Sequence, residues 1–162
     1  MKRARPSLPS TVMPVMLKPP RLRLNVQNAT RATDLPSAAV LRKWCKAALE
    51  RSMTLTLRFV DTREGRALNR DFRQKDYATN VLTFNYEDGS VNTEADIIVC
   101  VPVLRKEAAE QGKTLRAHLA HLVVHGTLHA QGYDHETLRE ARRMEPREIA
   151  ALSLLRIANP YE

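Results

Sequence analysis

The chain has 162 residues, of which 43% are hydrophobic and 27% charged, and its net charge is +8. That length suits one domain with a sizeable core, and the absence of a long apolar run leads us to expect no membrane partner. Two cysteines, Cys45 and Cys100, exclude a disulfide framework and a thiolate zinc site. We expect them to be small buried side chains of a cytoplasmic protein.

The first twenty residues differ from the rest in charge and in proline content. Residues 1–21 hold five cations and no acid, and five of the nine prolines lie among them. Prolines interrupt helices and strands, and the apolar stretch 12–17 is too short for a secretory signal. The sequence therefore predicts a disordered basic tail over 1–20, a single folded domain over 21–162, and a polyanionic partner.

Four segments have the pattern of β-strands. Apolar and polar residues alternate over 22–27 and again over 53–59, which is typical of strands with one buried face. Residues 80–86 and 96–101 predict two more strands. The unbroken apolar run Ile97–Val101 indicates that the last strand is buried on both faces.

The remaining segments predict helices. Asp34 and Pro36 mark the start of the first helix, a short helix follows over about 62–72, and everything after residue 101 has helical spacing. Within that region, 114–131 is apolar around most of its circumference, which predicts a central helix, and 136–157 predicts another. The order β-α-β-α-β-β-α-α-α predicts an α+β domain, with a mixed sheet of about four strands packed by about five helices.

A histidine block carries the chemistry of the chain: residues 125–135 read His-Gly-Thr-Leu-His-Ala-Gln-Gly-Tyr-Asp-His. His125 and His129 lie about one turn apart, on the same side of the central helix and at its end. Gly132 permits a left-handed turn that ends the helix and returns His135 to the same point. Three imidazoles with one coordination position left open are typical of catalytic zinc. We therefore predict about one zinc ion per chain at these three histidines.

The spacing of this block is that of the extended metzincin pattern with one substitution. The glutamate that follows the first histidine there, which is the general base of a peptidase, is Gly126 here. The predicted fold is therefore zincin-like, with its metal site at the end of the central helix, but the peptidase base is missing.

Four other polar residues lie in or near the block. His118 and His121 lie upstream on the same helix, and we interpret them as supporting or surface residues, because three ligands are already supplied. Asp134 could orient a ligand imidazole or bind the backbone of the turn, and the sequence leaves both open. Tyr133 is interpreted as a packing residue.

The block resembles the signature of the YbeY family, metal-dependent endoribonucleases of bacterial rRNA maturation. Residues 69–84 resemble the family's segment that carries a functional arginine, Ala95–Ile98 resembles one of its strands, and Met144 with Glu148 resembles its closing helix. The resemblance covers about residues 22–157 and excludes the basic tail.

The resemblance implies roles for four residues. His125, His129 and His135 would be the zinc ligands, and Arg73 would be the catalytic arginine that grips phosphate oxygens in a bidentate manner. Bound zinc would lower the pKa of water to about 7 and act as a Lewis acid on phosphate. The residues alone leave a second interpretation of Arg73 open, a structural ion pair with a neighbouring aspartate.

The implied function is that of a zinc-dependent endoribonuclease in the maturation of small-subunit rRNA, in ribosome biogenesis and in its quality control. The implied partners are the small ribosomal subunit, one of its proteins and an assembly GTPase. One alternative is a non-catalytic, zinc-containing ribosome-assembly factor whose basic tail binds RNA. A metalloprotease is the less favoured alternative, because its base is missing.

Overall fold

The structure is a computed structural model, and it describes residues 18–86 and 93–162. Most of the predicted basic tail, residues 1–17, lies outside this described part. The elements are, in chain order, β1 (Leu22–Asn28), α1 (Ala38–Ala47), β2 (Met53–Val60), α2 (Thr62–Arg73), β3 (Val81–Tyr86), β4 (Thr93–Cys100), α3 (Val101–Glu110), α4 (Leu115–Ala130) and α5 (Leu138–Leu154). The predicted α+β order of strands and helices is confirmed.

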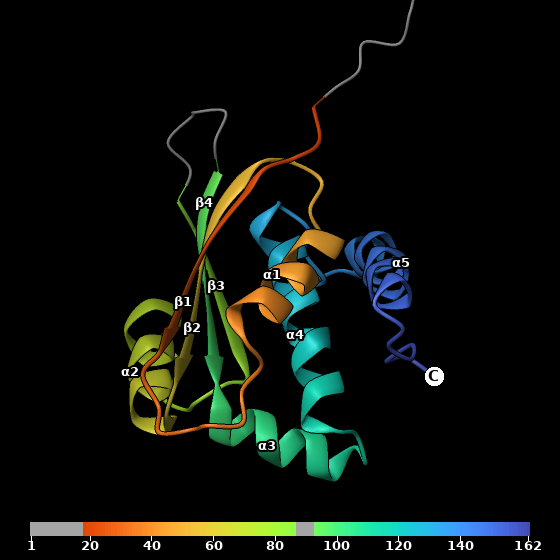
Figure 1. The fold of residues 1–162 in the computed structure, drawn as a ribbon. Coiled ribbons are helices and arrows are strands. Elements are labelled where there is room, and N and C mark those ends of the chain that lie inside the picture. Colours follow the sequence, from red (N-terminus) through yellow and green to blue (C-terminus); the bar gives the residue numbers. More distant parts are fainter. Residues whose placement is uncertain (1–17, 87–92) are drawn as a thin grey trace, which may run out of the picture.

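The four strands form one mixed sheet in the order β1-β2-β4-β3. Strands β1, β2 and β4 are parallel, and β3 pairs with β4 in the antiparallel direction. Figure 1 shows α2 on one face of the sheet and α1, α4 and α5 on the other. The sheet is therefore covered on both faces.

Each face of the sheet has its own apolar core, because side chains alternate along a strand. In β4, Ile97 and Val99 belong to the larger core, which includes residues of α1 and α4, whereas Ile98 and Cys100 belong to a smaller core on the other face. All four are buried, which confirms the prediction of burial on both faces. Cys45 and Cys100 are buried free thiols, as expected.

Helix α1 begins later than the sequence predicts. Its cap is Ser37, whose hydroxyl accepts a hydrogen bond from the amide of Val40 at 3.3 Å. The predicted start at Asp34 and Pro36 was wrong, because the Asp34 carboxylate forms an ion pair with Arg105 of α3 at 2.5 Å instead. The other predicted boundaries differ from the observed ones by three residues or fewer.

Helix α4 is the central helix, as its apolar sequence predicts. Thr114 caps its start by accepting a hydrogen bond from the amide of Ala117 at 3.1 Å. Most of its residues are buried, because it contacts β3, β4, α1, α3 and α5. Neither α4 nor any other helix in the described part of the chain combines the length and apolarity that crossing a membrane requires.

Close packing of α4 against β4 requires a glycine at position 126. A Cβ atom at Gly126 would lie 2.9 Å from Cγ2 of Ile97, which is well inside van der Waals contact. Ile97 is fully buried, and its branched side chain has little freedom to move aside. This contact fixes how closely the helix that carries His125 and His129 approaches the sheet.

We expect Gly126→Ala to be less stable than Gly65→Ala by about 1–3 kcal/mol, which is the usual cost of overpacking a core. Both substitutions gain the same helix propensity, but a Cβ atom at Gly65 would meet Cys100 Sγ at the more tolerable distance of 3.3 Å. Urea denaturation of both variants measures the difference. Equal stabilities would show that α4 can move away from β4 at no cost.

Candidate metal centre

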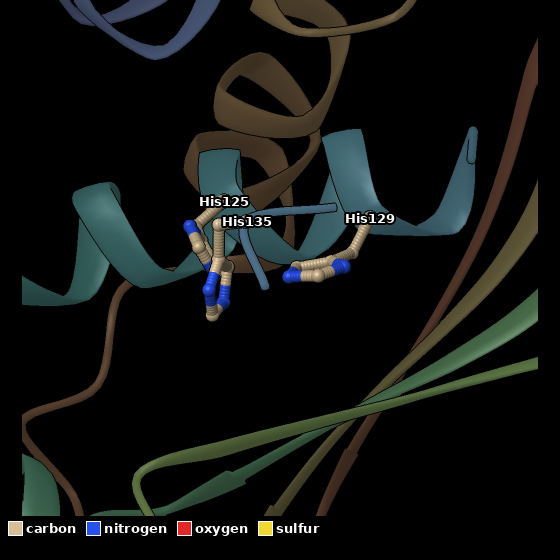
Figure 2. A group of neighbouring side chains, drawn as sticks. All are labelled: His125, His129 and His135. Atoms are coloured by element: carbon tan, nitrogen blue, oxygen red, sulfur yellow. The ribbon is translucent and has the colours of Figure 1, made fainter. Parts of the chain in front are cut away.

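Three histidines converge at the end of α4, as the sequence predicts. His125 and His129 project from α4 and His135 from the segment that follows it, and one ring nitrogen of each lies within 4.8 Å of the other two. The ring centroids are 4.7 to 5.0 Å apart. Figure 2 shows the three side chains pointing toward one another. The three nitrogens are therefore close enough to share one metal ion.

The turn that returns His135 to α4 depends on Gly132. Gly132 has a φ of +98°, in the region that favours glycine, and its amide donates to the carbonyl of His129 at 3.0 Å. The amide of His135 donates to the Asp134 carboxylate at 2.7 Å. Of the two roles left open for Asp134, the structure shows the one in which it binds the turn backbone.

The buried Glu148 of α5 holds the ring of His125. Its Oε1 lies 2.7 Å from His125 Nδ1. Burial opposes ionisation of this carboxyl, but hydrogen bonds from His121 and His125 outweigh it and lower the pKa of Glu148 to about 2. An ionised carboxylate can only accept, so His125 Nδ1 donates, and the lone pair of Nε2 is left for a metal ion.

His129 is held in the neutral form that a metal requires. Burial, followed by repulsion from His125 and His135, lowers its pKa to about 4. Because metal binding needs unprotonated imidazole, this ring offers a lone pair at neutral pH without first losing a proton. Nitrogen ligands of this kind suit Zn²⁺, so the residues present fit a zinc ion.

A second group also meets the distance condition for holding a metal: one ligand atom each of His121, His125 and Glu148 lie within 4.8 Å of one another. His121 Nε2 lies 2.9 Å from Glu148 Oε2, so both imidazoles of this group are already hydrogen-bonded to the carboxylate. These contacts suit a support for the ring of His125. His118 binds a different acid, Glu107, at 2.8 Å.

The segment that carries His135 is fastened by five residues that we call the loop clasp: Glu50, Arg51, Gln131, Tyr133 and Arg147. The buried Gln131 side chain accepts hydrogen bonds from the amides of Glu50 and Arg51 at 2.6 and 3.2 Å. The Arg51 guanidinium in turn donates to the backbone carbonyl of Gln131. Glu50 accepts from the Tyr133 hydroxyl at 2.7 Å and from Arg147 at 3.1 Å. Tyr133, predicted to pack, therefore also carries a hydrogen bond.

Arg73 lies at the end of α2 and lines the same cleft as the three histidines. One of its terminal nitrogens donates to the carbonyl of Thr83 at 2.9 Å, and its guanidinium carbon lies 5.9 Å from the centre of the Phe84 ring. The neighbouring aspartates that could have formed a structural ion pair with Arg73 are paired with other arginines: Asp71 with Arg70 and Asp76 with Arg66.

Sequence reasoning missed the acids that support the histidines. Glu148 came only from the family resemblance, as part of the closing helix, and Glu107 carried no signal at all. Their partners lie 11 to 27 positions away in the chain, so no local spacing reports them. The predicted supporting role fits His121, which contacts the same carboxylate as His125, whereas the contact of His118 with Glu107 does not link it to the three histidines.

The fold and the site together define an α+β protein with a cluster of three histidines that could hold a metal ion in an open cleft. A family model described as "Endoribonuclease YbeY" matches residues 25–156. A protein of that name from Herminiimonas arsenicoxydans is 57% identical over 149 residues, covering 87% of this chain and 96% of that protein. Another from Polynucleobacter asymbioticus is 53% identical over 146 residues, covering 87% and 94%. The chain belongs to the endoribonuclease YbeY family, a family of hydrolytic nucleases, which confirms the resemblance.

A solved structure supports the fold independently. The solution structure of TM1509 from Thermotoga maritima matches with a TM-score of 0.53 and 23% sequence identity, over 87% of this chain and 99% of that one. At this identity the likeness concerns the fold alone.

We expect Gln131→Met, which keeps the volume but removes the polar amide, to lower the free energy of unfolding by about 1–3 kcal/mol, because buried backbone groups lose their partners. The measurement is urea denaturation in the presence of a chelator, so that metal binding does not contribute. Gln111→Met, at the exposed end of α3, is the control and should change stability by less than about 0.5 kcal/mol. Equal effects would mean that the loop clasp contributes nothing.

Proposed function

We propose that this protein is a zinc-dependent endoribonuclease that acts in the maturation of small-subunit rRNA, in ribosome biogenesis and in its quality control. One observation carries the proposal: three histidines offer their ring nitrogens to one point in an open cleft that Arg73 also lines. The family supports it, because the relatives are named endoribonucleases.

In this proposal His125, His129 and His135 hold about one zinc ion per chain. A bound zinc ion would lower the pKa of water and act as a Lewis acid on phosphate. The neutral ring of His129 and the Glu148 carboxylate behind His125 support this ligand set. His121 and Glu148 then serve to orient a ligand, because their hydrogen-bonding atoms already face each other.

Arg73 is the proposed catalytic arginine, and it would bind the phosphate of the substrate. A guanidinium has five N–H donors, so the single bond to Thr83 leaves others free to bind two phosphate oxygens side by side. Lys75 and Lys113 line the same cleft and would attract the neighbouring phosphates. Glu148 is fully buried and already accepts three hydrogen bonds, so its role is to hold side chains, and it does not contact substrate.

The proposed partners are rRNA within the small ribosomal subunit, one protein of that subunit and an assembly GTPase. We further propose that residues 1–20 form a tail that adds electrostatic attraction to RNA, supported by five cations and no acid over 1–21. Residues 21–162 would be the single folded domain. Two buried thiols without a disulfide suit the reducing cytoplasm, which is the proposed location.

The peptidase alternative is opposed by packing as well as by sequence. A glutamate in place of Gly126 would need a Cβ atom only 2.9 Å from Ile97 Cγ2. The position that carries the general base in metzincins is therefore occupied here by a helix-to-sheet contact. The assembly-factor alternative keeps the same metal site without catalysis, and only experiment separates it from the proposal.

We expect purified protein to contain about one zinc per chain, and His129→Ala or His135→Ala to lose most of it, because two imidazoles bind zinc far more weakly than three. Elemental analysis measures the zinc content.

The wild type should cleave labelled rRNA, and chelator should stop the cleavage. The His129→Ala variant, prepared in parallel, controls for contaminating host ribonucleases. Unchanged zinc content in both variants would remove the proposed ligand set. A wild type that cuts nothing while His129→Ala still supports ribosome maturation would favour the assembly factor.

We expect Arg73→Ala to lower kcat for RNA cleavage by roughly 10²–10³, as the loss of one group that stabilises transition-state charge commonly does. Arg73→Lys should restore only part of the rate, because an ammonium cannot bind two oxygens in the same fork-like manner. Zinc content should not change in either variant. Arg70→Ala is the matched control, since Arg70 lies on the same helix but is exposed and paired with Asp71. A similar loss in Arg70→Ala would reduce Arg73 to one of several surface charges.

A further inference from the structure

Tyr161 returns from beyond α5 to the side of the metal centre. Its hydroxyl donates to Glu148 Oε2 at 2.5 Å, and its ring packs edge-to-face on His121 with centroids 5.8 Å apart. A local turn aims the side chain, because the amide of Tyr161 donates to the Asn159 side chain at 2.8 Å. Tyr161 therefore contacts Glu148 and His121, the residues behind His125.

The contacts on Glu148 are divided between its two oxygens. Oε2 accepts from Tyr161 and from His121, whereas Oε1 accepts from His125. Two donors on Oε2 fix the rotation of the carboxylate, so Oε1 faces the ring of His125. Because Glu148 is only 1% exposed, water cannot readily replace a lost donor. Burial and the bond to Glu148 raise the pKa of Tyr161 above its ordinary value, so the hydroxyl keeps the proton that it donates.

We propose that Tyr161 is a positioning residue of the metal centre: its hydroxyl fixes Glu148, and Glu148 holds His125 in the tautomer that offers Nε2 to the metal. This inference rests on the proposed ligand set. Groups that orient metal-bound histidines commonly change metal affinity tenfold to a hundredfold. Tyr161 acts through one intervening carboxylate, which retains His121 as a donor, so the expected effect lies at the low end of that range.

A purely structural role of Tyr161 would leave the metal affinity and the tautomer of His125 unchanged on substitution. Tyr161 is 47% exposed, and Tyr161→Phe keeps the ring that packs on His121 while it removes only the donor. Loss of a donor to a buried carboxylate lowers stability in either role, so the unfolding of the chelator-treated protein does not distinguish them. Metal affinity and the tautomer of His125 therefore report the positioning role, and stability does not.

The test compares Tyr161→Phe with the wild type in zinc competition against a chromophoric chelator. The zinc dissociation constant should rise by about tenfold. In the metal-free proteins, ring ¹⁵N shifts should show His125 protonated mainly at Nδ1 in the wild type and a mixture of tautomers in the variant. The matched control is Tyr86→Phe, which removes another phenol-to-carboxylate bond, the one to Asp96 at 2.8 Å, away from the three histidines. It should change neither readout.

The outcomes separate this inference from the function on which it rests. A wild type that takes up no zinc overturns the ligand set, and the inference with it. A wild type that binds zinc while Tyr161→Phe binds it equally tightly, with the His125 tautomer unchanged, overturns the positioning role alone. A tenfold loss in Tyr86→Phe also overturns it, because the effect would then not depend on Glu148.

Discussion

The site depends on holding three imidazoles together. One ring nitrogen of each lies within 4.8 Å of the other two, and burial, followed by repulsion from His125 and His135, lowers the pKa of His129 to about 4. The ionised Glu148 carboxylate accepts a hydrogen bond from the protonated Nδ1 of His125. Lone pairs are thereby directed to one point before any metal arrives, which reduces the cost of ordering the ligands on binding.

The packing of α4 against the sheet positions His125 and His129, and Gly126 connects this packing with the chemistry of the site. Helix α4 lies against β4 at the contact between Gly126 and Ile97, and this contact sets the height of His125 and His129 above the sheet. In a metzincin the same position carries the base that activates water for peptide hydrolysis. Here Ile97 lies where the Cβ atom of such a residue would be, so the packing of the helix leaves no room for that base.

The sequence predicts the parts of this protein that depend on local spacing. The three histidines follow from helical periodicity and a glycine turn, and the central helix follows from its apolar circumference; the structure confirms both. Contacts between distant segments were not predictable. Asp34 was read as a helix start because its pairing with Arg105 has no local signal, and the loop clasp joins the loop between α1 and β2, the end of α4 and α5. The role of Arg73 stays a prediction, because its place in the cleft is compatible with binding phosphate but does not demonstrate it.

The distribution of these contacts bears on whether the metal serves the fold or the chemistry. The larger apolar core lies between the sheet and helices α1 and α4, and its buried residues, such as Leu55, Leu57 and Phe59, are not metal ligands. Domains that need zinc in order to fold are usually too small to build such a core. Here the supports of the site, Glu148 of α5 and Gln131 at the end of α4, come from elements that the core already holds in place. The fold therefore positions the three histidines, and a metal ion bound by them in the open cleft would keep a coordination position free for a reactant, as the proposed enzyme requires.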